Sequence, residues 1–215
     1  MIDVLFGDVL YSNQLNINTQ DVIKKMSEPR KAEIHKSKDK PKSDASLYVL
    51  EEKQHATLKK IIDAEIYEYA NNIMKYNSKF NITTSWFTEV DTKERGDLHK
   101  HTNSFLSGVL YLNVNKKSGN ITFEKFTDEI SVTCTEYNKL NGKTYSIQPE
   151  NGLILLFPSK LWHSVGYNES EQIRNSLAFN VMPVGKVGLS SSDSHMKIKL
   201  VWTLHLGDYL LWVNR

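Results

Sequence analysis

The chain has 215 residues, of which 40% are hydrophobic and 24% are charged, a balance typical of a soluble globular protein. Its longest uninterrupted apolar run, LILLF at residues 153–157, is far shorter than the roughly 20 residues of a membrane-spanning helix, so we expect no membrane partner. The net charge of +2 favours no class of partner.

The start of the chain and its cysteine content indicate an intracellular protein. The first residues, MIDVLFGDVLYSN, lack the positive charge that opens a signal peptide, and we expect none. Cys134 is the single cysteine, which excludes an intrachain disulfide and fits a reducing compartment. We therefore expect a cytoplasmic location.

Residues 1–43 are predicted to form an N-terminal strand followed by a basic loop. The strand is predicted from a short apolar stretch at the start of the chain, which contains Val4, Phe6, Val9 and Tyr11. Residues 24–42 hold eight Lys or Arg against three Asp or Glu. No aromatic residues are interleaved there for base stacking, so we predict a solvated loop and expect no nucleic-acid partner.

Residues 44–76 are predicted to form a helix. Apolar residues recur there at three- and four-residue spacing and form one stripe: Leu58, Ile61, Ile62, Ile66, Tyr69, Ala70 and Ile73. Such a stripe is expected to pack against a sheet and to take no part in chemistry.

The remainder of the chain is typical of a β protein. Short segments of alternating polarity, separated by turn signals such as KLNGK and PENG, predict eight strands at 82–90, 104–114, 119–126, 129–137, 143–147, 152–157, 161–165 and 172–182. This spacing favours a mainly β jelly roll with a flanking helix, formed by residues 44–183. Residues 184–215 form a C-terminal extension whose apolar end, LHLGDYLLWV, is expected to pack locally as a strand or short helix.

Three histidines suggest a metal site. His99 and His101 stand one residue apart, so in an extended strand their imidazoles point to the same face. Asp97 shares that face, and His163 lies at the start of a distant strand. Two or three such ligands leave coordination positions open for a substrate, as in non-haem iron oxygenases, which usually combine two histidines with one carboxylate. The other histidines (His35, His55, His195 and His205) have no such setting.

A candidate anion-binding pair follows the third histidine. Arg174 and Ser176 lie two residues apart in the strand IRNSLAFNV and therefore share a face. A guanidinium that points into a barrel is costly unless an anion meets it, and its planar fork matches a carboxylate. An internal salt bridge to Glu124 or Asp128 is the alternative.

The order of these pieces resembles the family of 2OG-Fe(II) oxygenases within the 2-oxoglutarate- and Fe(II)-dependent dioxygenase superfamily. The resemblance covers roughly residues 47–183, and its motifs are His-x-His, SGVLYLN, GLILLFPSKLWHSV and IRNSLAFN. It implies a double-stranded β-helix, or cupin-like jelly roll, with helices outside the sheet. This His-x-His branch is one seen in marine bacteria and their phages, which is compatible with a phage-encoded protein.

The resemblance also implies roles for single residues. His99 and His163 match the first and last iron ligands, and His101 stands where the superfamily usually has Asp or Glu. Arg174 matches the arginine that binds the distal carboxylate of 2-oxoglutarate, and Ser176 supports it. Tyr111 matches a position that often reaches the co-substrate from a neighbouring strand.

Two further residues of the pattern, Trp86 and Asn180, receive no role from the resemblance, and core packing is the default for Trp86. The departure at His101 leaves the site one negative charge short of the usual ligand set. Imidazole-only sites also suit zinc, copper or nickel. Asp97 is the alternative ligand, or a residue that orients an imidazole from behind.

The resemblance therefore implies an enzyme that uses Fe(II), 2-oxoglutarate and O2 to hydroxylate an unidentified substrate, with release of succinate and CO2. Two alternatives stay open: a cupin-like metalloenzyme that does not use 2-oxoglutarate, and a metal-free jelly-roll module for binding or structure. A homodimer is compatible with the sequence.

Overall fold

The structure is a computed structural model, and it describes residues 7–26, 30–31, 47–126 and 133–199. Several expectations lie outside these residues: the strand residues Val4 and Phe6, most of the basic loop, His35, Asp128, His205 and the apolar C-terminal end.

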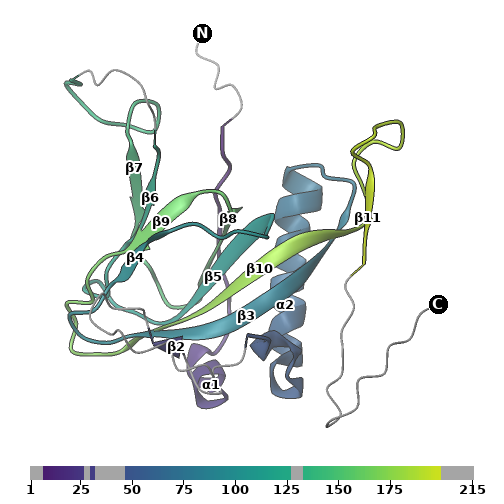
Figure 1. The fold of residues 1–215 in the computed structure, drawn as a ribbon. Helices are drawn as coiled ribbons and strands as arrows, with labels where there is room; N and C mark the ends of the chain where they lie inside the picture. Colours follow the sequence, from purple (N-terminus) through teal and green to yellow (C-terminus); the bar gives the residue numbers. More distant parts are fainter. Residues whose placement is uncertain (1–6, 27–29, 32–46, 127–132, 200–215) are drawn as a thin grey trace, which may run out of the picture.

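The described chain is organised around two β-sheets (Figure 1). The larger sheet has the order β1-β8-β5-β10-β3-β2, with β11 paired to β10, and its strands are β1 (Tyr11–Gln14), β2 (Arg30–Lys31), β3 (Lys79–Val90), β5 (Leu106–Asn113), β8 (Leu153–Pro158), β10 (Arg174–Val187) and β11 (Met196–Ile198). The smaller sheet has the order β4-β9-β6-β7, with β4 (Gly96–His99), β6 (Ile121–Glu124), β7 (Thr144–Ile147) and β9 (Trp162–Val165). All pairs are antiparallel except β2 with β3.

A helix covers the outer face of the larger sheet (Figure 1). Helix α2 (Ala56–Tyr67) continues into the π-helix η3 (Glu68–Ile73), and together they bury Leu58, Ile62, Ile66, Tyr69 and Ala70, the core of the predicted stripe. The sheet contributes Phe87, Leu110, Leu156, Leu177 and Phe179 among others to the same cluster. Burial of these apolar side chains is the main force that holds α2 on the sheet.

The two faces of strand β10 carry different kinds of side chain. Its odd-numbered residues Leu177, Phe179 and Val181 belong to the helix-facing core. Arg174, Ser176 and Asn180 alternate with them and therefore face the smaller sheet. The polar face of β10 is thus turned inward, between the two sheets.

A second apolar cluster joins the inner faces of the two sheets. Tyr111, Leu155 and Phe157 of the larger sheet meet Ile121 and Phe123 of the smaller one. The rings of Phe123 and Phe157 pack edge to face with centroids 4.9 Å apart. Packing in this cluster holds the two sheets together, and the positions of the inward polar residues relative to one another depend on that packing.

The predicted mainly β jelly roll with a flanking helix is confirmed. Seven of the eight predicted strands correspond to β3, β5, β6, β7, β8, β9 and β10. The strand predicted at 129–137 is wrong in its described part, because residues 133–137 form no strand. Strands β1 and β11, from the two flanking segments, both pair with the larger sheet, and the three-part division of the chain stays a prediction.

The predicted helix at 44–76 starts too early. Two single 3₁₀ turns, η1 (Val49–Glu51) and η2 (Lys53–His55), precede α2, which begins at Ala56. Glu52 is extended between these turns, with ψ 136°, so a continuous helix cannot pass through it. A short helix, α1 (Thr19–Lys24), was not predicted; Asn18 caps its start by accepting from the Asp21 backbone N–H.

Across the part of the chain that the structure describes, none of the helices has the length and hydrophobicity that crossing a membrane would require.

Candidate metal centre

The three predicted histidines come from two paired segments. His99 ends β4 and lies directly opposite His163 of β9 in the register of that pair. His101 lies beyond the end of β4, so the expected period-two geometry of one strand does not apply to it. Its position is instead set by its backbone N–H, which donates to the carbonyl of Ser159 at 3.0 Å.

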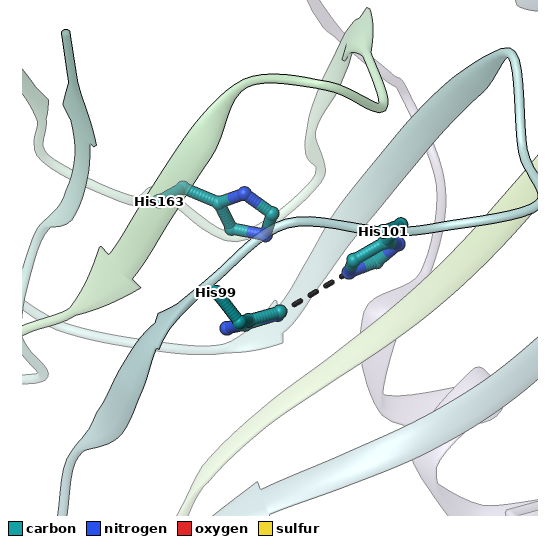
Figure 2. Close-up of side chains that lie close together, drawn as sticks. All are labelled: His99, His101 and His163. Carbon is teal, nitrogen blue, oxygen red and sulfur yellow. Dashed lines mark hydrogen bonds between the residues drawn. The ribbon is translucent and has the colours of Figure 1, made fainter. Parts of the chain in front are cut away.

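The imidazoles of His99, His101 and His163 converge nevertheless (Figure 2). One ring nitrogen of each lies within 4.8 Å of the others, and the Nε2 atoms of His99 and His101 are 3.2 Å apart. That separation is close to the distance between neighbouring ligand atoms around an ion whose metal–nitrogen bonds are about 2.1 Å. The described residues thus form a three-histidine group suited to one metal ion.

Hydrogen bonds at the other ring nitrogen orient all three imidazoles. His99 Nδ1 donates to the carbonyl of Asp97 at 2.7 Å, and His163 Nδ1 donates to the carbonyl of Leu161 at 2.9 Å. His101 Nδ1 lies 2.5 Å from Asn180 Oδ1. A carbonyl oxygen can only accept, so these contacts place a proton on each Nδ1. The 3.2 Å approach of His99 Nε2 to His101 Nε2, dashed in Figure 2, then joins two lone pairs, which is the arrangement of two ligands of one metal ion and not a hydrogen bond.

Burial keeps two of these imidazoles neutral. His163 is 4% exposed, and burial, together with the neighbouring His99 and His101, lowers its pKa to about 3 despite the opposing bond to the Leu161 carbonyl. Burial also lowers the pKa of His101. Neutral imidazole is the form that binds a metal, so these two histidines would bind one without losing a proton.

Asp97 approaches the group through its backbone and not through its carboxylate. Its carbonyl accepts from His99, whereas its Oδ1 atom lies 3.7 Å from Arg95 Nε. The carboxylate is outside the group of metal-binding atoms that the described residues form. Asp97 therefore lies beside the three histidines, where its backbone carbonyl orients the His99 ring.

Arg174 and Tyr111 form a second polar pair on the inner face. Arg174 is 2% exposed, its Nη1 donates to Ser176 Oγ at 3.4 Å, and its guanidinium lies over the Tyr111 ring with 5.2 Å between its central carbon and the ring centroid. Ser176 and Tyr111 are direct partners in the β10–β5 pair. Burial lowers the pKa of Arg174 and raises that of Tyr111 to about 12.

Among the residues that the structure describes, this pair has no partner of opposite charge. Among the described residues, Arg174 Nε and the Tyr111 hydroxyl have no hydrogen-bond partner of good geometry other than the approach of these two side chains to each other, and no carboxylate forms an ion pair with Arg174. The salt bridge to Glu124 considered above does not form, and Asp128 lies outside the described residues. A buried guanidinium with an unsatisfied donor is costly, and a carboxylate ligand would satisfy it.

The structure also places the residues for which the sequence gave no role. Trp86 is half-buried, and its ring centroid lies 5.8 Å from that of His101, so it borders the metal site and is not simply core. Asn180 contacts His101 directly, which sequence reasoning missed. Of the remaining histidines, His55 packs edge-on against Phe87 in the interior and His195 lies near the β10–β11 pair.

Comparison with known proteins finds one family that matches the part of the chain carrying the candidate site. Residues 84–180 match the family described as "Putative 2OG-Fe(II) oxygenase". The matched segment contains the three histidines, Arg174 and Asn180. No curated protein matches the chain.

Several solved structures are similar. SnoN, a non-heme alpha-ketoglutarate-dependent epimerase from nogalamycin biosynthesis, is 12% identical with a TM-score of 0.54 over 86% of this chain and 81% of its own. A 2OG-Fe(II) oxygenase family oxidoreductase from Burkholderia pseudomallei is 10% identical with a TM-score of 0.43, over 62% of this chain and 52% of its own. A prolyl-4-hydroxylase from Pseudomonas putida is 16% identical with a TM-score of 0.41, over 60% of this chain and 65% of its own.

The chain spans about half the length of the Burkholderia structure. Of the three similarities, that to SnoN supports the jelly-roll fold predicted from the sequence. The family match covers residues 84–180 of the 215, and over these residues the chain is similar to the family of 2OG-Fe(II) oxygenases.

Proposed function

We propose that the protein is a 2-oxoglutarate- and Fe(II)-dependent dioxygenase that hydroxylates a C–H bond of a substrate still to be identified. One observation supports this choice over a metalloenzyme without 2-oxoglutarate: a fully buried arginine with an unsatisfied donor lies on the same inner layer as three converging imidazoles. A site for metal alone would not need that guanidinium.

In this proposal, the Nε2 atoms of His99, His101 and His163 hold the iron. Arg174 and Ser176 bind the distal carboxylate of 2-oxoglutarate, for which the guanidinium fork is the matching shape. The Tyr111 hydroxyl, which has no partner of good geometry among the described residues and lies beside Arg174, donates to the same co-substrate. Burial keeps this hydroxyl protonated, since it raises the pKa of Tyr111 to about 12.

Iron and 2-oxoglutarate together supply the oxidative chemistry, in which O2, 2-oxoglutarate and the substrate give succinate, CO2 and the hydroxylated product. The protein supplies orientation and a dry environment. Phe123 and Phe157 contact the His163 ring, with centroids 5.9 and 5.0 Å away, and shield its side of the site from water. Trp86 borders the opposite side, at His101.

The charges also fit a dianionic co-substrate. Three neutral imidazoles leave the two positive charges of Fe(II) uncompensated, and Arg174 adds a third, buried one. The two carboxylates of 2-oxoglutarate would offset most of this charge, one at the metal and one at Arg174. This takes over part of the role of the carboxylate ligand that the described residues do not supply.

The test is an anaerobic titration of purified protein with Fe(II) and 2-oxoglutarate, in which the visible metal-to-ligand charge-transfer band is followed. We expect the band in the wild type and its loss in His163→Ala and Arg174→Met. His195→Ala and Arg95→Met are matched controls away from the inner face, and both should retain the band.

The other outcomes separate the alternatives. If the wild type binds iron but shows no band, and if Arg174→Met binds iron equally well, the result would favour a cupin-like enzyme that does not use 2-oxoglutarate. Absence of both metal and band in the wild type would leave a jelly-roll module for binding or structure.

A further inference from the structure

The third histidine is held in place differently from the other two. His99 and His163 each donate from Nδ1 to the carbonyl two residues earlier in their own segment, at Asp97 and Leu161. His101 makes no such bond, and it lies beyond the end of β4. Its Nδ1 meets a side chain of another strand, Asn180 of β10, at 2.5 Å.

We infer that Asn180 is the positioning residue that makes His101 a metal ligand, by fixing both its ring orientation and its tautomer. The inference rests on the proposed function, since it assumes that the three histidines hold a metal. It assigns a role to a residue that the reaction itself does not need to touch.

The Asn180 amide is itself fixed at both ends. Its Nδ2 donates to Thr84 Oγ1 at 3.0 Å, so its Oδ1 is turned toward His101. The Ser107 hydroxyl donates to the same Oδ1 at 2.9 Å. Because Asn180 pairs with Thr84 on one side and with Ser107 on the other, the three side chains share the inner face of the sheet.

A group of serines supports this arrangement from behind. Ser107 Oγ lies 2.8 Å from Ser159 Oγ, which in turn donates to Ser104 Oγ at 3.0 Å. Ser107 and Ser159 are both fully buried. Polar groups buried in this way are costly unless they are paired, so the network has little freedom to rearrange.

The tautomer follows from the contacts of His101. Ser107 Oγ lies 3.0 Å from His101 Nδ1, so in the absence of Asn180 its hydroxyl could donate to that nitrogen. The ring proton would then sit on Nε2, where it blocks metal binding. With the acceptor Oδ1 of Asn180 beside Nδ1, the proton stays on Nδ1 and the Nε2 lone pair points to the metal position.

Asn180 also connects the two halves of the site. Asn180 and Arg174 lie on the same face of β10, so one strand orients the metal ligand His101 and presents the guanidinium proposed to bind 2-oxoglutarate. The spacing between metal and co-substrate carboxylate is therefore set within a single strand.

The experiment measures Co(II) binding, since Co(II) is stable to air and its visible spectrum reports coordination geometry. Asn180→Leu removes the acceptor, and we expect Co(II) affinity to fall about 10- to 100-fold, the usual loss for a group that orients a metal-bound histidine. Asn180→Asp keeps an acceptor at Oδ1 and should bind within a few-fold of wild type. Asn175→Leu, on the same strand but the other face, is the matched control and should leave affinity unchanged.

A second measurement keeps the inference testable if Asn180→Leu folds poorly. Imidazole ¹⁵N shifts of the metal-free wild type should show His101 protonated at Nδ1, and Thr84→Val, which releases the amide, should increase the Nε2-protonated form. Wild-type-like Co(II) affinity in Asn180→Leu, or an Nε2 proton on His101 in the wild type, would overturn the inference alone. Failure of the wild type to bind Co(II) would overturn it together with the proposed function.

Discussion

His99 and His163 are direct partners across the antiparallel pair of β4 and β9, with ring centroids 4.4 Å apart, although they are far apart in the chain. A metal ion bound to both would therefore tie the edge strand β4 to the rest of the smaller sheet. Binding to the folded state alone raises the free energy of unfolding.

We expect metal to stabilise the wild type by about 2.7 kcal/mol when the free ion is at about 100 times its dissociation constant. Denaturant unfolding with Co(II) and with a chelator measures the difference. His163→Ala should lose this gain, whereas His195→Ala should keep it. An equal gain in both variants would mean that the ion binds elsewhere.

We expect Arg174 to lower the stability of the ligand-free protein and to strengthen the binding of 2-oxoglutarate. Its guanidinium is buried, and no carboxylate pairs with it among the described residues. Even a buried ion pair can often be replaced by apolar side chains of similar size with no loss of stability or with a gain of about 1–4 kcal/mol, and a buried charge without a partner is less favourable still. We therefore expect Arg174→Met to unfold at the same or higher denaturant concentration, while 2-oxoglutarate binding weakens by about 2–5 kcal/mol.

Calorimetry with the Co(II)-loaded protein measures that loss. Arg174→Lys should restore only part of the affinity, because an ammonium lacks the planar fork of the guanidinium. Arg95→Met, a surface arginine over the Tyr167 ring, is the control. Strong destabilisation of metal-free Arg174→Met would show instead that the arginine serves the fold.

Asp97 and His101 can be separated as ligands. Because Asp97 contacts His99 through its backbone carbonyl, Asp97→Ala should change metal affinity by no more than about three-fold, within the range of a lost surface charge. His101→Ala removes a ring nitrogen from the group and should cost well over about 10-fold, more than the loss of an orienting partner. Metal titration of both variants decides the matter, and the reverse order would make the Asp97 carboxylate the ligand.

Gly108, in the SGVLYLN segment, is required by packing. A Cβ added there would lie 2.2 Å from the Phe179 ring and 2.8 Å from Leu156 Cδ2, both in the helix-facing core. Overpacking of this kind costs about 1–3 kcal/mol, so Gly108→Ala should lower the free energy of unfolding by that amount. At Gly166 an added Cβ meets nothing closer than 3.5 Å, so Gly166→Ala is the control and should be near neutral.

The inward face of β10 was predictable from the sequence because it depends on local spacing. Arg174 and Ser176 lie two residues apart, and any strand turns such a pair to one face. The convergence of His163 with His99 was also predictable, from the resemblance. The position of His101 beyond β4 and the contact from Asn180 depend on how distant segments meet, which no local pattern records.

The start of the helix escaped prediction for a similar reason. Val49 and Leu50 extend the apolar pattern, but they are buried in a 3₁₀ turn, and the Leu50 N–H donates to Ser85 Oγ on β3 at 3.0 Å. A tertiary bond thus replaces a helical one.

The cytoplasmic location, the phage origin and the homodimer stay predictions, since no contact in the described chain bears on them.

His55 predicts a pH dependence of stability that is independent of the metal site. It is 2% exposed, packs against Phe87, and its Nε2 has no hydrogen-bond partner among the described residues. Burial lowers its pKa below the ordinary value of 6.5, although the charge of Glu52 opposes the shift. The unfolded chain therefore binds a proton at a higher pH than the folded one, so stability contributed by neutral His55 is present above pH 6.5 and is lost as the pH falls below it.

The free energy of unfolding is measured against pH for the metal-free wild type and for His55→Gln, in which residue 55 cannot titrate. The two pH profiles should differ. His101 and His163 titrate in both proteins and cancel in the comparison. Below about pH 6.5 the wild type should lose stability faster than the variant, by at most about 1.4 kcal/mol per pH unit for one proton. Parallel profiles from about pH 7.5 to 5 would mean that folded His55 takes up its proton as readily as the unfolded chain does, in spite of its burial against Phe87.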